Sequence, residues 1–365
     1  MNHQEEEPQI RPRGKKVMLP HGGLPEVIPQ YLLNLIAQTG GPDGPIGKQF
    51  VADPQSERAG FEGVASDPLI EDEHLAAPGL VYKYDAIVDE GGTVLRPGRA
   101  LWTITYTCAA YCRFCTRGRE VGVPAGYTWE GNNQPHSPHL SREQIDKALE
   151  FIENEPHLNE IILSGGDPLT VHPDVLKYVL WRLSLLQEKG KLDIVRIGTR
   201  LPIHNPLAIK DTHYEAVAQL HNPRLMVHIN HPQELTPEAL STLDRFRRQC
   251  GAIEMSQTVL LKGVNDTPDT LVELFREIAK QGMVPYYLYQ NDPVYWAHHF
   301  TVPIREAIDL WQQVRSRLSG VAATCRFVID TPGGYGKVPI PEGNAWKVDW
   351  EQGFTDFNGT HFELE

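Results

Sequence analysis

Three of the five cysteines of the chain, Cys108, Cys112 and Cys115, lie within eight residues in the pattern C-x3-C-x2-C. Thiolates are soft ligands that favour zinc, copper(I) or iron–sulfur clusters. A structural zinc site takes four ligands, and neither Cys250 nor Cys325 is near in the sequence. Three thiolates in one short loop therefore favour a four-iron cluster with one iron left to bind a substrate or cofactor. For Cys250 and Cys325 we expect burial as small apolar side chains.

The segment around the three cysteines is positively charged. Arg113, Arg117 and Arg119 lie in or beside the pattern, and guanidinium groups suit an anionic cluster or an anionic ligand. The alternative is that the three cysteines are only buried apolar side chains. Their tight spacing and the surrounding cations favour the cluster.

The elements that must position these side chains follow from the pattern after residue 100. Short runs such as ALWTITYT and NEIILS read as strands, and SREQIDKALEFIENE reads as a helix with Ser141 and Gln144 in a capping box. About six such units predict parallel strands covered by helices. We expect a (β/α)6-type partial TIM barrel, with a doubly wound open sheet as the alternative. No G-x-G-x-x-G follows the first strand, which disfavours a dinucleotide-binding form of that alternative.

In a parallel βα barrel, the residues after the carboxyl end of each strand gather on one rim, where active sites lie. These positions hold the cysteine loop, SGGDPL from Ser164, TRLP from Thr199, the segment 228–231, Gln257 to Asp266, Asn291 with Asp292, and Asp330 with Lys337. The strand interiors are apolar. The distribution of polar residues thus predicts an active site at this rim.

Composition sets the domain organisation and excludes some partners. We expect an N-terminal wrapping region over residues 1–95 with a helix near 26–38, a barrel domain over 96–340, and a C-terminal tail over 341–365. A formal net charge of −13 argues against nucleic acid and anionic membranes as partners. No apolar run approaches the ~18 residues of a membrane span, and the charged N-terminus has no signal-peptide core. We expect a cytoplasmic protein.

These motifs resemble those of the radical S-adenosylmethionine enzymes. The cysteine pattern with Phe114 before its last cysteine, and the GGD of Gly165 to Asp167, carry that resemblance. CRFCTRGR, LSGGDPL, VRIGTRLP, VHINHP, SQTVLLKGVND, PYYLYQND and DTPGGYGKVP are similar to the lysine 2,3-aminomutase family, in order over roughly residues 66–341. The resemblance implies three cofactors: a [4Fe-4S] cluster, S-adenosyl-L-methionine and pyridoxal 5'-phosphate.

In that family, the reduced cluster cleaves S-adenosylmethionine to a radical that removes the β-hydrogen of an amino acid, and the amino group moves from the α to the β carbon. The resemblance assigns the cluster to Cys108, Cys112 and Cys115. It assigns S-adenosylmethionine to Phe114, Ser164, Gly165, Gly166, Asp167, His228 and Gln257. An electron donor of flavodoxin or ferredoxin type is also implied.

The resemblance assigns pyridoxal phosphate to Lys337, as the catalytic lysine that binds it covalently, and to Lys83, Tyr84 and Arg99. A lysine after the flexible PGGYG run can reach a cofactor, and burial lowers its pKa enough for it to react. The chain departs from the family between Tyr84 and Arg99, where an inserted segment with DEGG between apolar runs predicts a hairpin. Lys83 stands where the family has an arginine, and lysine binds phosphate without the guanidinium fork.

The substrate prediction depends on three residues. Arg117 matches the arginine that binds the substrate carboxylate, and Asp292 and Asp330 match two aspartates that bind the distal ammonium of lysine. Two neighbouring carboxylates repel one another without a cation between them. We therefore predict conversion of L-lysine to β-lysine. The alternatives are arginine or ornithine as substrate, lysine used for modification of elongation factor P, and a non-catalytic iron–sulfur sensor. Longer members of the family carry a C-terminal extension, whereas about 25 residues follow Pro341 in this sequence. We expect a homo-oligomer and do not assign its number of subunits.

Overall fold

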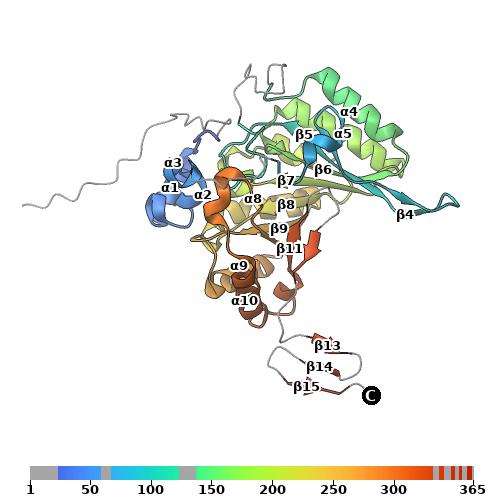
Figure 1. Ribbon diagram of the computed structural model, residues 1–365. Coiled ribbons are helices and arrows are strands. Elements are labelled where there is room, and N and C mark those ends of the chain that lie inside the picture. The colour runs from blue at the N-terminus through green and yellow to red at the C-terminus, as the bar shows by residue number, and fades with distance from the viewer. Residues whose placement is uncertain are drawn as a thin grey trace, which may run out of the picture.

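The computed structural model describes residues 24–58, 67–122, 137–331, 337–340, 347–349, 353–355 and 360–363. Within them, ten strands form one sheet in the order β1-β2-β5-β6-β7-β8-β9-β10-β11-β12 (Figure 1). The strands are β1 Leu75–Ala77, β2 Leu80–Tyr84, β5 Gly98–Thr105, β6 Leu158–Gly165, β7 Ile194–Thr199, β8 Arg224–His228, β9 Ile253–Leu260, β10 Val284–Gln290, β11 Arg326–Asp330 and β12 Lys337–Pro339.

The seven strands from β5 to β11 pair in parallel, each with the next along the chain. At the edges, β1, β2 and β12 are antiparallel. Helices follow most strands: α4 Arg142–Asn154, α5 Pro173–Glu188, α6 Leu201–His204, α7 Asp211–Val217, α8 Pro237–Cys250, α9 Pro268–Lys280 and α10 Ile304–Arg315. This is the predicted (β/α)6-type partial barrel. Pairing among the described strands runs from β1 to β12 without closing the sheet.

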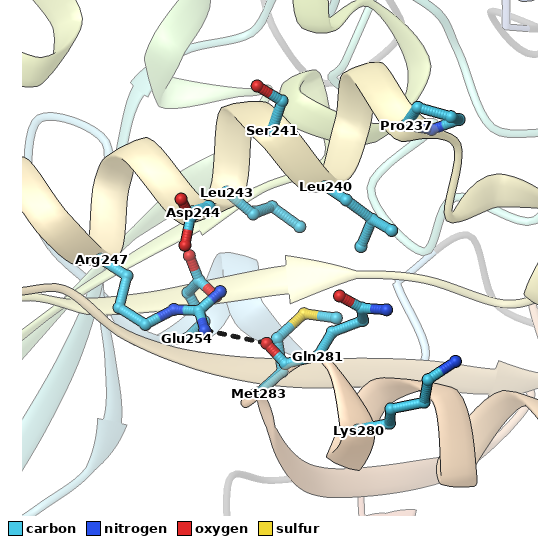
Figure 2. A pocket seen from close by; sticks show the side chains of 10 residues that line it. All are labelled: Pro237, Leu240, Ser241, Leu243, Asp244, Arg247, Glu254, Lys280, Gln281 and Met283. Atoms are coloured by element: carbon cyan, nitrogen blue, oxygen red, sulfur yellow. Dashed lines mark hydrogen bonds and ion pairs between the residues drawn. The ribbon is translucent and has the colours of Figure 1, made fainter.

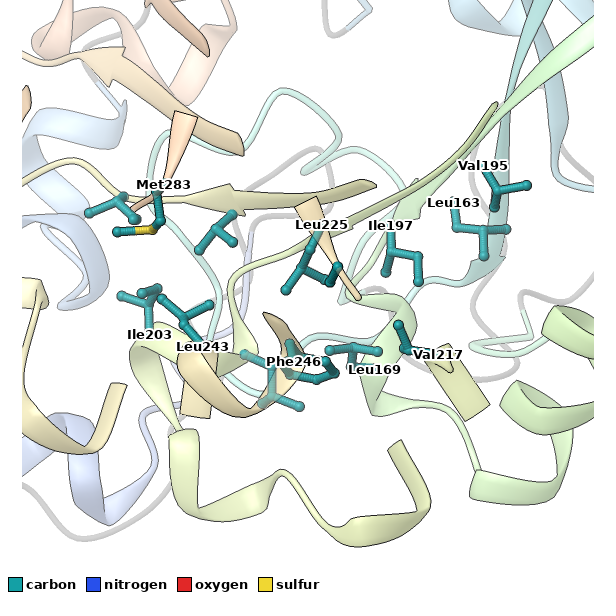
Figure 3. Close-up of a cluster of buried hydrophobic side chains, with 14 of the residues drawn as sticks. Leu163, Leu169, Val195, Ile197, Ile203, Val217, Leu225, Leu243, Phe246 and Met283 are labelled. Carbon is teal, nitrogen blue, oxygen red and sulfur yellow. The ribbon is translucent and has the colours of Figure 1, made fainter. Parts of the chain in front are cut away.

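The main core lies between the strands and these helices. Figure 3 shows Leu163, Ile197 and Leu225 of the strands facing Val217 of α7 and Phe246 of α8, and all of them are buried. Because strand side chains alternate between faces, the intervening residues point to the opposite face. That face is polar, since it carries Glu160, Arg196, Gln257, Tyr289 and Asp330 among others. The alternation therefore separates an apolar packing face from a face suited to bind ligands.

The N-terminal region contributes to both the sheet and the rim. Its helices α1 Gln30–Gln38, α2 Gly47–Phe50 and α3 Pro54–Arg58 lie beside the rim, while β1 and β2 form one sheet edge (Figure 1). The helix predicted near residues 26–38 is thus confirmed as α1. The hairpin expected in the inserted segment is confirmed too: β3 Ile87–Val88 pairs with β4 Val94–Arg96. The C-terminal part forms a small sheet of β13 Lys347–Asp349, β14 Gly353–Thr355 and β15 His361–Phe362.

Most predicted elements agree with the structure to within a few residues. The capping box of Ser141 and Gln144 is present at the start of α4. Sequence analysis placed no helix between β7 and β8, where α6 and α7 lie. Pro202 and Pro206 each begin a short turn there, and they obscure the helical period of the seven-residue α7. None of the helices in the described part of the chain has the length and apolar character that crossing a membrane requires.

Candidate active site at the carboxyl ends of the strands

The cysteine loop follows β5 and is enclosed by two apolar clusters. One cluster includes Tyr111, Phe114, Trp296 and Phe300, with all three cysteines packed against it. The other includes residues of α1 and α2 and contacts Cys112. The indole N–H of Trp296 donates to the carbonyl of Cys115 at 3.1 Å. Apolar walls on both sides keep most water away from the thiols, as an oxygen- and water-sensitive cluster requires.

The three thiols lie close enough together to disfavour one another's ionisation. Burial raises the pKa of Cys108 most, and the charges of Asp167, Cys115 and Cys112 raise it further. Burial and then the charge of Cys112 raise the pKa of Cys115 to about 12. Among the described residues, no His, Cys, Asp or Glu groups converge on one point as ligands of a single metal ion. An iron–sulfur cluster does not require such convergence, because each thiolate binds a different iron.

The GGD turn after β6 is bound to the cysteine loop by its backbone. The N–H of Gly166 donates to the carbonyl of Thr105 at 2.8 Å, and the N–H of Asp167 donates to that of Thr107 at 3.0 Å. Gly165 has φ +96, and a Cβ on it would meet the side chain of Thr103 at 2.2 Å. Only glycine fits at this position. The two backbone hydrogen bonds hold the GGD turn beside the cysteine loop, as the predicted cofactor contacts require.

The carboxylate of Asp167 faces the interior instead of open space. It is buried and accepts hydrogen bonds from the hydroxyl of Thr199 at 2.8 Å and from the N–H groups of Arg200, Leu201 and Leu169 at 2.8, 2.9 and 3.0 Å. The side chain predicted to hold the methionine amine thus fixes the turn after β7.

The other residues predicted for S-adenosylmethionine line the same rim. The imidazole of His228 packs against the ring of Phe114 with centroids 5.6 Å apart and is hydrogen-bonded to Asn230 at 3.1 Å. Burial, and then the charge of Arg200, lower the pKa of His228 to about 3, so the ring is neutral. Ser164 lies on β6 opposite Thr103 of β5.

Gln257 connects this group to the lysine predicted for pyridoxal phosphate. Its amide donates to the hydroxyl of Tyr289 at 2.9 Å, and the ring of Tyr289 lies 4.8 Å from Nζ of Lys337. Nζ of Lys337 donates to Asp330 at 2.5 Å. Burial lowers the pKa of Lys337. Sequence analysis did not assign Tyr289, although it lies in the motif PYYLYQND. The run PGGYG before Lys337 lies outside the described residues.

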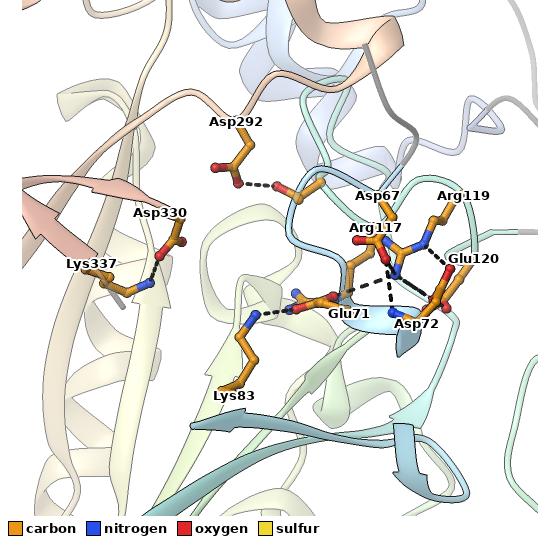
Figure 4. Close-up of polar contacts among 11 residues, drawn as sticks. Asp67, Glu71, Asp72, Lys83, Arg117, Arg119, Glu120, Asp292, Asp330 and Lys337 are labelled. Atoms are coloured by element: carbon orange, nitrogen blue, oxygen red, sulfur yellow. Dashed lines mark hydrogen bonds and ion pairs between the residues drawn. The ribbon is translucent and has the colours of Figure 1, made fainter. Parts of the chain in front are cut away.

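Asp292 and Asp330 end neighbouring strands and face a common space (Figure 4). The hydroxyl of Thr116 donates to Asp292 at 2.7 Å. Burial, followed by the charge of Asp330, raises the pKa of Asp292 to about 6. The two carboxylates are therefore within electrostatic reach of one another, and Lys337 forms an ion pair with Asp330.

Glu71 is a central residue that sequence analysis missed. Its buried carboxylate accepts from Nε and Nη2 of Arg117 at 2.8 and 2.6 Å and from Nζ of Lys83 at 2.7 Å (Figure 4). It thus links the arginine predicted for the substrate carboxylate with a lysine predicted for phosphate. These cations hold the pKa of Glu71 well below its usual range despite burial.

Arg99 lies apart from that cluster, at the amino end of β5. Its Nε donates to Glu160 at 2.8 Å, and Arg196 also pairs with Glu160. Glu160 therefore holds two arginines side by side, and guanidinium groups bind phosphate oxygens well. For Tyr84, the structure describes the backbone of β2 but not the side chain.

The arginines around the cysteines are paired with carboxylates. Arg113 binds Glu57, Arg117 binds Glu71, and Arg119 pairs with Asp72 at 2.9 Å. The guanidinium that contacts a cysteine sulfur belongs instead to Arg200, whose Nη1 donates to Sγ of Cys112 at 2.9 Å. The segment TRLP was part of the predicted rim, but no role was predicted for Arg200.

A cavity of about 500 Å³ lies between α8 and α9, away from this rim (Figure 2). It is lined by Pro237, Leu240, Ser241, Leu243, Asp244, Arg247, Glu254, Lys280, Gln281 and Met283. Glu254 lies at the amino end of β9, whereas Gln257 and the other candidate residues lie toward carboxyl ends. In βα barrels the amino face serves stability rather than catalysis, so the rim is the candidate active site.

Comparison with known proteins agrees with this geometry. Residues 102–257 match the model of the radical SAM superfamily. The chain is 33% identical over 314 residues to L-lysine 2,3-aminomutase of Clostridium subterminale, covering 86% of this chain and 68% of that protein. It is 33% identical over 317 residues to the Methanococcus maripaludis L-lysine 2,3-aminomutase, covering 87% and 66%. The chain belongs to the lysine 2,3-aminomutase family of radical S-adenosylmethionine enzymes.

The L-lysine 2,3-aminomutase of Fusobacterium nucleatum is also similar, at 34% identity over 274 residues, which cover 75% of this chain and 58% of that protein. The chain spans about two thirds or less of the length of these relatives. Family membership implies an enzyme with a [4Fe-4S] cluster and S-adenosylmethionine. The residues present fit such a cluster, because three partly buried cysteines sit between apolar walls with a guanidinium on one sulfur.

Proposed function

We propose that this enzyme is a pyridoxal phosphate-dependent isomerase that moves the α-amino group of L-lysine to the β-carbon. The observation that carries the proposal is the pair of carboxylates at the ends of β10 and β11. Asp330 accepts a hydrogen bond from Lys337, whereas Asp292 has a hydroxyl partner and a raised pKa. A second cation in this space would stabilise the charged form of Asp292. The ε-ammonium of lysine is such a cation.

The residues around Lys337 support pyridoxal phosphate as the further cofactor. The side chain of Lys337 is 25% exposed, so burial favours its neutral amine, the form that attacks an aldehyde. Asp330 accepts the hydrogen bond from Nζ and so fixes the direction of the amine. Lys83 and Arg99, with Arg196 beside it, supply positive charge for the phosphate. The family relatives are named for the same reaction.

Arg117 would bind the substrate carboxylate. Its contacts with Glu71 use Nε and Nη2, so among the described residues Nη1 keeps its donor capacity for a second carboxylate. Glu71 fixes the plane of the guanidinium. A substrate held by Arg117 at one end and by Asp292 and Asp330 at the other would have its length selected as well as its charge.

The cofactors supply chemistry that the side chains lack: S-adenosylmethionine on the reduced cluster supplies a radical, and pyridoxal phosphate binds the migrating amino group. The chain orients the substrate and excludes water. The reduction step needs an electron donor, for which we propose a flavodoxin or ferredoxin type. We also propose that the protein is cytoplasmic, because the reducing conditions of the cytoplasm keep the five free cysteines as thiols. We further propose that it forms a homo-oligomer.

The direct test is anaerobic. The protein is reconstituted with iron, sulfide and pyridoxal phosphate, given S-adenosylmethionine and a reductant, and incubated separately with lysine, arginine and ornithine. Mass spectrometry after amine derivatisation should show β-lysine from lysine. Asp292→Asn and Asp330→Asn should abolish the preference for lysine, while Asp309→Asn, on the outer helix α10, should leave it unchanged.

Each alternative predicts a different outcome. If only arginine or ornithine gives a β-amino product, that amino acid is the substrate instead of lysine. Asp292 and Asp330 would then bind its distal cation. Activity that appears only with lysine and elongation factor P would point to the modification pathway. Lys337→Ala separates the enzyme from a sensor, because a sensor would lose nothing, whereas the mutase would lose pyridoxal phosphate absorbance and turnover.

A further inference from the structure

Arg200 is the first residue after β7 and reaches the cysteine loop across the rim. Its Nη1 donates to Sγ of Cys112 at 2.9 Å. Sequence separation between the two residues is 88, so the contact is a product of the fold rather than of the cysteine motif. The contact places an N–H of a cation against a sulfur that the family assigns to the cluster.

The guanidinium of Arg200 is held through its two terminal nitrogens, while its buried Nε has no hydrogen-bond partner among the described residues. Its Nη2 donates to Gln49 at 2.5 Å and to Glu234 at 3.0 Å. The ring of Phe50 lies 4.6 Å from Cζ, and that of Phe114 lies 5.5 Å from it. Only 6% of the residue is exposed. Glu234 balances the charge of Arg200, so the two side chains form a nearly neutral ion pair. Within that pair, Nη1 of Arg200 directs its N–H at the sulfur.

The partners of Arg200 are themselves fixed. The amide of Gln49 donates to Glu234 at 2.7 Å and accepts from Asn230 at 2.9 Å. The carbonyl of Gln49 accepts from the N–H of Arg113 in the cysteine loop at 2.8 Å. The N-terminal region therefore supports both the donor and the loop that carries the sulfur.

Arg200 also meets the GGD turn. Its backbone N–H donates to the carboxylate of Asp167 at 2.8 Å, while the backbone of Asp167 is bonded to Thr107 directly before Cys108. One residue thus joins the turn predicted to hold S-adenosylmethionine and the loop that holds the cluster.

We propose that Arg200 is a positioning residue that raises the reduction potential of the cluster through its hydrogen bond to Cys112. One electron enters on reduction and no bond breaks, so the negative charge on the cluster and its thiolates increases. An N–H donor on a ligating sulfur stabilises that charge, and such bonds tune iron–sulfur potentials. Loss of the donor should make the cluster harder to reduce.

The test compares Arg200→Lys with Arg113→Lys. Lysine keeps the charge, but its single nitrogen, drawn to Glu234 and Gln49, cannot also reach the sulfur as the fork does. Arg113 is the matched control, because it is equally buried beside the cysteines and its guanidinium binds Glu57 and the carbonyls of Leu24 and Pro25. Redox titration of the reconstituted cluster, followed by its electron paramagnetic resonance signal, needs neither pyridoxal phosphate nor lysine, so it is independent of the proposed substrate.

We expect Arg200→Lys to lower the equilibrium constant for one-electron reduction about tenfold, which corresponds to about 59 mV. Arg113→Lys should change it less than twofold. Equal shifts in both variants, or no shift in Arg200→Lys, would overturn the proposal.

A second measurement uses the unaltered chain and does not depend on whether the variants fold. Protein labelled with 15N-arginine is reduced, and pulsed electron paramagnetic resonance records the 15N nuclei coupled to the cluster. A coupling that persists in Arg113→Lys and is absent from Arg200→Lys supports the hydrogen bond. Absence of any arginine coupling in the unaltered protein refutes it.

Discussion

Two buried carboxylates on the polar side of the sheet each bind more than one cation. Glu71 holds Arg117 and Lys83, and Glu160 holds Arg99 and Arg196. Each carboxylate fixes the position of its cations, and fixed cations are what a substrate carboxylate and a phosphate require. The acids at the other side, Asp292 and Asp330, leave negative charge in excess beside Lys337. In the proposed function, the region around Glu71 receives the carboxylate of the substrate, and the region around Asp292 and Asp330 receives its ammonium group.

Glu71→Gln tests the first region. Removing one partner of a buried ion pair leaves uncompensated charge and typically costs about 3–5 kcal/mol. We expect the free energy of unfolding of the cofactor-free protein to fall by about 3 kcal/mol in urea denaturation. Asp72→Asn is the control, because the Asp72 side chain is 62% exposed and surface pairs contribute about 0–1 kcal/mol. Equal losses in both variants would show that Glu71 does not organise the cluster.

Asp292 gives a pH dependence. Its carboxyl has a pKa raised to about 6 by burial and by the charge of Asp330. Above that pH Asp292 is charged and can hold an ammonium group; below it Asp292 binds a proton and loses attraction for the substrate. We expect kcat/KM for lysine to fall as the pH drops through about 6. Asp292→Asn should remove this inflection and lower kcat/KM about 10- to 100-fold at pH 8, since a hydrogen bond to a charged group contributes about 1.5–3 kcal/mol. An inflection that persists in the variant would assign it to another group.

At the scale of elements, the GGD turn and the cysteine loop behave as one unit. A Cβ on Gly166 would meet the carbonyl oxygen of Thr107 at 2.5 Å and the oxygen of Thr105 at 2.8 Å, so the backbone before Cys108 must shift. We expect Gly166→Ala to halve, or reduce further, the iron bound per chain after reconstitution. Gly320→Ala is the control, because its Cβ would meet nothing within 4 Å. Full iron loading of Gly166→Ala would show that the two motifs are separable.

The same elements show what a sequence can predict. Strands β5 to β11 and helices α4, α5, α8, α9 and α10 follow from apolar periods and capping residues, which are local signals. The position of the candidate site follows from the polar residues that come directly after each strand. Glu71 and Arg200 do not follow, because each acts on a partner 46 or 88 residues away. Asp167 shows the same limit, since its motif places the backbone correctly but cannot tell which way the carboxylate turns.

At the scale of the whole molecule, the two ends of the strands have different tasks. The carboxyl ends carry the candidate site, and the amino ends carry structural groups such as Glu254, which lines the cavity between α8 and α9 (Figure 2). Its side chain is 1% exposed and lies 3.2 Å from Arg247. Burial raises the pKa of Glu254 to about 7, with Arg247 opposing the shift. Ionisation of Glu254 therefore lowers the free energy of unfolding, and this residue lies away from the candidate active site.

The sign of that cost gives a prediction for the folded protein. Between pH 4.5 and about 7 the unfolded chain releases the proton of Glu254 while the folded protein retains it. The free energy of unfolding must therefore fall as the pH rises through this interval and stay low above it. The interval corresponds to about 3 kcal/mol at most, at 1.36 kcal/mol for each pKa unit. Glu254→Gln removes the titration, so in urea denaturation it should stabilise the protein at pH 8 by up to about 3 kcal/mol and change little near pH 4.5. Glu188→Gln, at a side chain 57% exposed, should show no such dependence. A Glu254→Gln effect that is equal at both pH values would mean that the pKa of Glu254 is the same in the folded and unfolded protein, because the charge of Arg247 cancels the effect of burial.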